Sequence, residues 1–244
     1  MKQILTVIFL ILFISSLLGQ DKSNLEESIQ VENWYLIEYL DSTIINKKIY
    51  KYSGACASYA YKITFDRNNM DSISFIGYHE SWKDKLDEWD EVSYTMGDDS
   101  QYWKINFDNE SLTIQEFFRD HDTTANIFSR RENIPPLKEY FSKNIFTGTY
   151  IRESNNSTII FNNDYTITGL DSIVNYSLII DFWEEGNGMD GMYLYTKDGN
   201  FEEYHWWFDG RNLNLRKVRG AYENESDWIK AKVVGETTVL KKIK

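Results

Sequence analysis

Cysteine, proline and histidine are scarce in this chain of 244 residues. The single cysteine, Cys56, excludes an intrachain disulfide, and we expect a buried, unreactive thiol. The chain has two prolines and three histidines, and it contains no motif of a zinc hydrolase, serine hydrolase or phosphate loop. Asp198-Gly199-Asn200 offers oxygen ligands that suit calcium, but it is also an ordinary hairpin turn, which we expect here. The sequence therefore predicts a protein that is not an enzyme and has no metal or other cofactor.

The chain also has fewer positively charged residues than negatively charged ones. Lysine and arginine together number 26 against 38 aspartates and glutamates, which gives a formal net charge of −12. A phosphate backbone or an anionic membrane surface would be repelled over most of such a protein. We therefore expect no nucleic-acid partner, and the charge mainly favours solubility.

Long hydrophobic runs are missing after the N-terminus, so no membrane span is predicted. Residues 1–20 combine Lys2, the short apolar run Ile4–Ile14 and small residues near Gly19, which is the pattern of a secretory signal. Gln20 stands where a bacterial lipoprotein would have its lipid-accepting cysteine. We expect export to the periplasm or the exterior without a lipid anchor, and an uncleaved N-terminal anchor is the alternative.

Apolar residues recur with a period of two, which is typical of strands that bury one face. The pattern is clear from Val174 to Phe182, and it also predicts a strand from Trp34 to Leu40. Turn signals separate these runs at short intervals, so the chain is predicted to be all-β, as a sandwich or barrel. Helices are predicted only around residues 82–89 and over residues 137–143.

Two parts of the chain match at an offset of 101 residues. Phe107 and Leu112 fall on Phe208 and Leu213, and both copies have the pattern of a strand, a tight turn and a strand. Convergence of two β-hairpins is the alternative. Because adjacent prolines interrupt strand pairing, we place a boundary at Pro135-Pro136. The predicted organisation is a signal peptide (1–20), a first β domain (21–132), a linker (133–144) and a second β domain (145–244).

Strand alternation separates two faces within these copies. One face is the predicted core and contains Trp103, Ile105, Phe107, Tyr204, Trp206 and Phe208. On the other face of the second copy, Glu203, His205 and Trp207 project together. An aromatic plane beside polar groups can stack on a sugar or close over an apolar ligand. The alternative is that another layer of structure covers this face and buries Trp207.

Trp82 and Trp89 form a second candidate site. They are seven residues apart, so on the predicted helix they lie near one stripe and can act as a lid on a barrel. The alternative is a charged surface helix that is anchored by its two aromatic residues.

The second half resembles the small lipocalin-like domains of secreted bacterial proteins. Gly148-Thr149-Tyr150 is similar to their Gly-x-Trp opening, Phe161 to Gly169 covers their hairpin, and Leu213-Asn214-Leu215 fits their late strand. In the first half, Asn33-Trp34-Tyr35 keeps the tryptophan but lacks the glycine. The resemblance implies two antiparallel lipocalin-like β-barrels or half-barrels in tandem. Such a barrel holds a small apolar ligand or is filled by its own side chains.

These observations favour a secreted, non-catalytic binding protein that holds a small or amphipathic ligand in one barrel, the second. The predicted ligand-binding residues are Glu203, His205, Trp207, Trp82 and Trp89. One alternative is a carbohydrate-binding or adhesion module that uses exposed tryptophans, with a glycan as ligand. Another is an envelope module that binds a protein partner and has no pocket.

Overall fold

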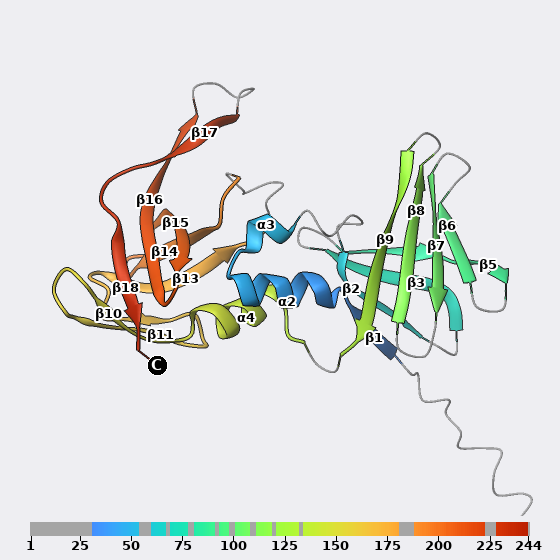
Figure 1. Cartoon of the computed structure of the whole chain (residues 1–244), viewed down its shortest axis with the longest axis horizontal. Coiled ribbons are helices and arrows are strands. Elements are labelled where there is room, and N and C mark those ends of the chain that lie inside the picture. The colour runs from blue at the N-terminus through green and yellow to red at the C-terminus, as the bar shows by residue number, and fades with distance from the viewer. Residues whose placement is uncertain are drawn as a thin grey trace, which may run out of the picture.

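The described part of the chain is mainly β and forms two antiparallel sheets in tandem, joined by short helical segments (Figure 1). One sheet is a half-barrel and the other is a nearly closed barrel, which confirms the predicted all-β class. The predicted signal segment and Cys56 lie outside the described residues. The computed structural model describes residues 31–53, 60–66, 69–77, 81–90, 93–97, 101–107, 111–118, 121–131, 134–180, 188–222 and 228–243.

The first sheet has nine strands in the order β4-β3-β2-β1-β9-β8-β7-β6-β5. Neighbours in this sheet are neighbours in the chain, except that the first strand, β1, pairs with the last, β9. The edge strands β4 and β5 follow each other in the chain with only Leu86 between them. The strands are β1 (Val31–Tyr35), β2 (Ala60–Asp66), β3 (Asn69–Gly77), β4 (Ser81–Lys85), β5 (Asp87–Asp90), β6 (Ser93–Gly97), β7 (Gln101–Phe107), β8 (Ser111–Phe118) and β9 (His121–Arg130).

The second sheet has the order β12-β11-β10-β18-β16-β15-β14-β13, and β17 pairs with β16 outside this path. A bridge between Thr166 and Asn175 joins its two edges, and the Tyr176 N–H donates to the Tyr165 carbonyl at 2.9 Å. These contacts nearly close the barrel. The strands are β10 (Gly148–Arg152), β11 (Thr158–Phe161), β12 (Ile167–Thr168), β13 (Ile173–Ile179), β14 (Gly191–Thr196), β15 (Phe201–Asp209), β16 (Asn212–Tyr222), β17 (Trp228–Val233) and β18 (Thr238–Lys242).

The two sheets follow the same circuit. In each, the first strand lies between the second strand and the last, and the other strands continue as a meander. Phe107 opposes Leu112 in the β7–β8 hairpin, and Phe208 opposes Leu213 in the β15–β16 hairpin. The registers of these two hairpins therefore coincide at the predicted offset of 101 residues. The predicted core face is also confirmed, because its six residues are fully buried or pack against the core.

Each sheet also places an aromatic residue of its first strand beside a basic residue of its last strand. Trp34 opposes Arg130, whose guanidinium lies 5.2 Å from the ring centroid. Tyr150 opposes Lys242, whose Nζ lies 5.5 Å from the ring centroid. Both rings are buried. A cation over an aromatic face stabilises by about 0.5–2 kcal/mol, so each pair helps to hold the first strand against the last.

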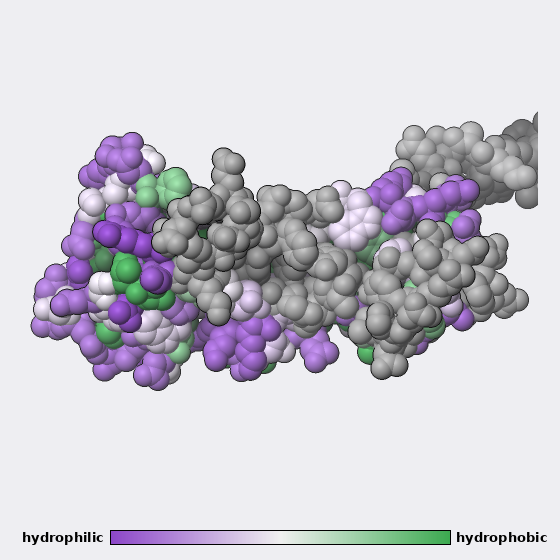
Figure 2. All heavy atoms as spheres, turned by 90° about the horizontal axis from the view of Figure 1, so that it is seen from above, coloured by the Kyte–Doolittle hydropathy of each residue, from purple (hydrophilic) through white to green (hydrophobic). Residues whose placement is uncertain are grey.

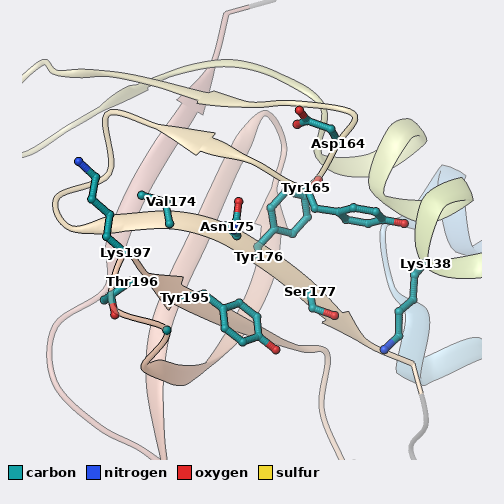
Figure 3. Close-up of a pocket in the computed structure, with 11 residues that line it drawn as sticks. Lys138, Asp164, Tyr165, Val174, Asn175, Tyr176, Ser177, Tyr195, Thr196 and Lys197 are labelled. Atoms are coloured by element: carbon teal, nitrogen blue, oxygen red, sulfur yellow. The ribbon is translucent and has the colours of Figure 1, made fainter.

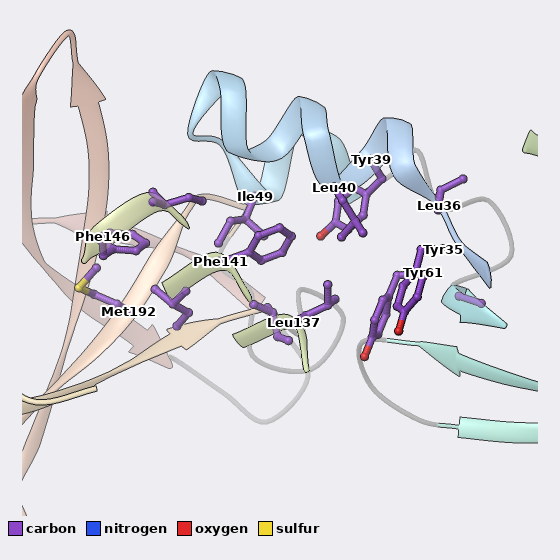
Figure 4. Close-up of a cluster of buried hydrophobic side chains, with 14 of the residues drawn as sticks. Tyr35, Leu36, Tyr39, Leu40, Ile49, Tyr61, Leu137, Phe141, Phe146 and Met192 are labelled. Carbon is purple, nitrogen blue, oxygen red and sulfur yellow. The ribbon is translucent and has the colours of Figure 1, made fainter. Parts of the chain in front are cut away.

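Short helical segments connect the sheets. Tyr39 meets Phe141 edge to face, with ring centroids 5.9 Å apart, and Ile49 and Leu137 are buried beside them (Figure 4). Pro136 directly precedes the second helical pair, where the missing N–H of proline breaks no helical hydrogen bond. The helix predicted over residues 137–143 is thus confirmed. The segments are α2 (Ile37–Asn46), α3 (Ile49–Ser53), α4 (Leu137–Phe141) and the π-helical turn η1 (Ser142–Phe146).

Two predictions of secondary structure are wrong. The strand predicted from Trp34 to Leu40 ends at Tyr35, and α2 begins at Ile37. The buried residues of α2 are Tyr39, Leu40 and Thr43, a helical spacing that outweighs the short alternation before it. Conversely, the helix predicted around residues 82–89 is two strands, β4 and β5, and exposure alternates along β4 with a period of two.

Among the described residues, no helix is both long and apolar enough to cross a membrane. Figure 2 shows one face of the molecule, on which the described surface of the second barrel is mainly hydrophilic with separate hydrophobic patches. Scattered apolar residues of this kind are normal on protein surfaces. A binding site is therefore better sought in a hollow that combines apolar and polar groups.

Candidate functional site

An open groove runs along the outer wall of the second barrel beside β13 and β14 (Figure 3). Its volume is about 680 Å³. The turn between β11 and β12 and the helix α4 border it on one side, and the turn between β14 and β15 borders it on the other. Residues with polar side chains that line it include Lys138, Asp164, Asn175, Ser177, Tyr195 and Lys197.

The period of two along the strands decides which side chains face this groove. Tyr176 of β13 is only 2% exposed and points to the barrel core, so Asn175 and Ser177 on either side of it point outwards. Cross-strand pairing places Tyr195 opposite Asn175 and Tyr193 opposite Ser177. The wall therefore presents a row of tyrosines on β14 beside a row of small polar side chains on β13.

Two carboxylates near the groove are fixed by hydrogen bonds within their own turns. Asp164 accepts from the N–H and the hydroxyl of Thr166 at 3.1 and 2.6 Å, and these bonds hold its pKa below the usual range. Asp198 accepts from the Thr196 hydroxyl, which lowers its pKa, and from the Asn200 amide at 2.7 Å. Both groups are therefore charged near neutral pH. The Asp198 segment is the hairpin turn that the sequence predicts.

Charged groups of both signs surround the groove. Lys138, Lys197 and Asp164 line it, and Asp198 lies in the turn that borders it beside Thr196 and Asn200. The described residues contain no cluster of three or more histidine, cysteine or acidic side chains that could hold a metal ion. The groove thus offers hydrogen-bonding donors and acceptors, charged groups of both signs and an aromatic wall.

The lumen of the second barrel, by contrast, is packed with aromatic side chains. Phe146 of η1 is fully buried, and its ring centroid lies 4.7 Å from that of Trp206. The Tyr150 hydroxyl donates to the Phe146 carbonyl at 2.6 Å, and burial raises the pKa of Tyr176 to about 12. Further rings around Phe146 are those of Phe161, Tyr176 and Phe208, at 6.4, 6.1 and 6.0 Å.

Charged side chains line the end of this lumen that lies away from the helices. Arg152 is two residues beyond the buried Tyr150 on the same strand, so it follows the inward row. Its guanidinium pairs with Asp171 at 2.9 Å, and Lys217 pairs with Glu202 across β15 and β16. The inward rows of these strands therefore change from apolar to ionic towards this end.

Three of the predicted ligand-binding residues share the outer face of the second barrel. Glu203, His205 and Trp207 alternate with buried or core-packed residues of β15, and Tyr193 opposes Glu203. The imidazole of His205 stacks on Trp207 with ring centroids 5.2 Å apart, and its Nδ1 lies 2.8 Å from the Asp190 carbonyl. The three side chains project together as expected, but the groove beside them is lined by other residues.

The two remaining predicted residues belong to the first sheet. Trp82 lies on β4 and stacks on Phe75 with ring centroids 5.1 Å apart and an interplanar angle of 9°. Trp89 belongs to β5, the strand at the opposite edge of that sheet. Because both segments are extended, the structure does not support a helical lid, and the five predicted residues do not form one site.

Asp190 makes a contact between the two halves that the sequence did not reveal. Its carboxylate accepts from the Tyr50 N–H at 2.7 Å and from the Ile49 N–H. These groups lie in the first turn of α3, where N–H groups have no partner inside the helix. Burial raises the Asp190 pKa, against the opposing effects of these hydrogen bonds and of electrostatic interactions with His205 and Lys48.

Stability should therefore respond to pH through Asp190. Its pKa is higher in the folded chain than in the unfolded chain, so protonation favours folding. We expect Asp190→Asn to melt at a higher temperature than the wild type at pH 7. The difference should shrink as the pH falls through the raised pKa towards the unfolded value of about 4. Thermal melts from pH 7 to pH 4, in steps of about one unit, measure it.

A matched control for this prediction is Asp190→Ala, which removes the acceptor altogether. Loss of a capping acceptor costs about 1 kcal/mol, so the alanine variant should melt below the asparagine variant at every pH. If the difference in melting temperature between the wild type and Asp190→Asn widens as the pH falls, the direction given to the Asp190 pKa shift is wrong.

Fold and groove together define a tandem all-β protein with an open site on one barrel wall. No model of a known protein family matches the chain, and comparisons with curated proteins and with solved structures find no match either. The fold and the groove alone therefore carry the inference of function.

Proposed function

We propose that this chain is a secreted, non-catalytic binding protein built from two lipocalin-like halves. The up-and-down order of strands in both sheets supports the lipocalin-like assignment, because the resemblance in the sequence implies antiparallel barrels of this kind. The signal pattern of residues 1–20 supports export to the periplasm or the exterior. The ligand is a small molecule with both apolar and polar parts.

The groove beside β13 and β14 is the observation that carries this proposal. Its volume of about 680 Å³ is in the range of small-molecule sites, and Tyr195 lies beside Asn175 in a groove that Lys138 and Lys197 also line. Aromatic side chains fill the lumen, so the barrel wall is a better place for a ligand than the interior. Asp164 is a charged hydrogen-bond acceptor with a lowered pKa, which suits binding better than proton donation.

Native mass spectrometry of protein purified gently from its own host tests this function. The wild type should carry an additional mass that disappears on denaturation. Tyr195→Ala removes an aromatic ring from the groove and should raise the Kd about tenfold, which corresponds to about 1.4 kcal/mol, so the occupied fraction should fall under equal conditions.

Tyr102→Ala is the matched control, because Tyr102 stacks on Phe117 in the first sheet, 4.8 Å between ring centroids, far from the groove. It should keep the wild-type occupancy. Equal occupancy in both variants would place the ligand elsewhere. If the wild-type protein carries no additional mass and binds none of a panel of small amphipathic molecules, the proposed binding function is wrong.

A further inference from the structure

The groove continues into a cluster of three aromatic rings on the outer face of the second barrel. Tyr195 lines the groove, and its ring centroid lies 5.6 Å from that of Phe201 and 6.5 Å from that of Tyr193. Tyr193 and Phe201 meet edge to face at 5.1 Å. Phe201 is 58% exposed, so a large apolar ring faces solvent at the border of a concave site.

A local difference between the two halves builds this cluster. The offset of 101 residues would place Tyr195 opposite Trp206, as Tyr94 is opposite Ile105 in the first sheet. In the second sheet Tyr195 instead opposes Phe201, because the β14–β15 hairpin turns earlier in the chain than the offset of 101 residues would place its turn. The rings therefore gather on the outer face of the barrel, where Phe201 is exposed.

The polar groups beside these rings suit hydroxyl groups better than an ion. Asn175 is exposed directly opposite Tyr195 and offers both a donor and an acceptor. Lys138, Lys197 and Asp164 give the groove charged groups of both signs, so it does not present a field of one sign that would select an ionic ligand. A sugar ring has an apolar C–H face that packs on aromatic rings and hydroxyls at its edge that both donate and accept.

We propose that the groove binds a neutral oligosaccharide, with the C–H face of one sugar ring packed against Phe201, its edge in contact with Tyr195, and its hydroxyls hydrogen-bonded to Asn175. Neighbouring sugar units extend along β13 towards Lys138. This inference rests on the proposed binding function and names the class of ligand. A long acyl chain fits the site less well, because the groove is open and bordered by charged groups, whereas such a chain needs an enclosed apolar space.

Isothermal titration of the purified chain with cellohexaose, chitohexaose and maltohexaose tests the inference, with oligogalacturonate and palmitate as comparison ligands. At least one neutral hexasaccharide should bind more tightly than either comparison ligand. Phe201→Ala and Tyr195→Ala should each weaken that binding about three- to tenfold, the usual range for loss of an aromatic contact. Tyr102→Ala should leave it unchanged, and thermal melts confirm that each variant is folded.

The other outcomes separate this inference from the function on which it rests. If palmitate or oligogalacturonate binds in a manner that depends on Tyr195 and no neutral sugar binds, the ligand class is wrong and the groove function stands. If a neutral sugar binds equally well to wild type, Tyr195→Ala and Phe201→Ala, the site is wrong. If no probe binds and the purified protein also carries no additional mass, both proposals fail.

Discussion

Replacing Phe146 with alanine is expected to lower the free energy of unfolding by about 3–5 kcal/mol. The ring is fully buried and lies among four other aromatic rings, of which Trp206 is nearest at 4.7 Å. Removal of the ring takes away its hydrophobic burial and leaves a cavity that the rigid barrel wall only partly closes. Because domains are usually stable by only 5–15 kcal/mol, the loss is a large share of the total.

Urea denaturation followed by near-ultraviolet circular dichroism measures this loss, since the signal reports on packed aromatic side chains. Phe201→Ala is the matched control, because it makes the same chemical change at a ring that is 58% exposed, and it should cost less than about 1 kcal/mol. A cost below about 1 kcal/mol for Phe146→Ala as well would show a lumen with free space. Ligand binding inside the barrel would then regain support.

The strands of the second half could largely be predicted from the sequence. Tyr176 and Leu178 are buried while Asn175 and Ser177 face outwards, as the alternation indicates. The secondary structure of the first half was harder to predict. The alternation from Trp34 to Leu40 is short enough to fit a strand, yet the chain enters α2, whose apolar side packs on α4 of the other half. Such tertiary contacts override local patterns and are not visible in one segment.

The candidate site was less accessible to sequence reasoning because separate segments build it. Lys138 comes from a helix, Asp164 from a turn and Tyr195 from a strand, and only the closure of the barrel brings them together. A signal was present in the alternation of Tyr193 and Tyr195 before a short turn, which predicts two rings on one strand face. Nothing local to Asp190 indicates that it caps a helix of the other half.

Alanine at Gly169 is expected to destabilise the second barrel by about 2–5 kcal/mol, because it combines backbone strain with overlap. Gly169 follows β12 and has a φ of 86°, which side chains other than glycine rarely adopt. A Cβ atom here would overlap the carbonyl oxygen of Thr158 on β11. Since that atom belongs to a paired strand, β11 and β12 would have to separate.

Gly199→Ala separates the two causes. Its φ of 84° matches that of Gly169, but no heavy atom lies within 4 Å of the added Cβ. In the same urea titration, the free energy of unfolding of this variant should fall by only about 1–2 kcal/mol, which is the cost of the strained backbone alone. Equal losses at both positions would contradict the close approach of β12 to β11. A larger loss at Gly169 is expected, because there the overlap with the Thr158 carbonyl adds to the backbone strain.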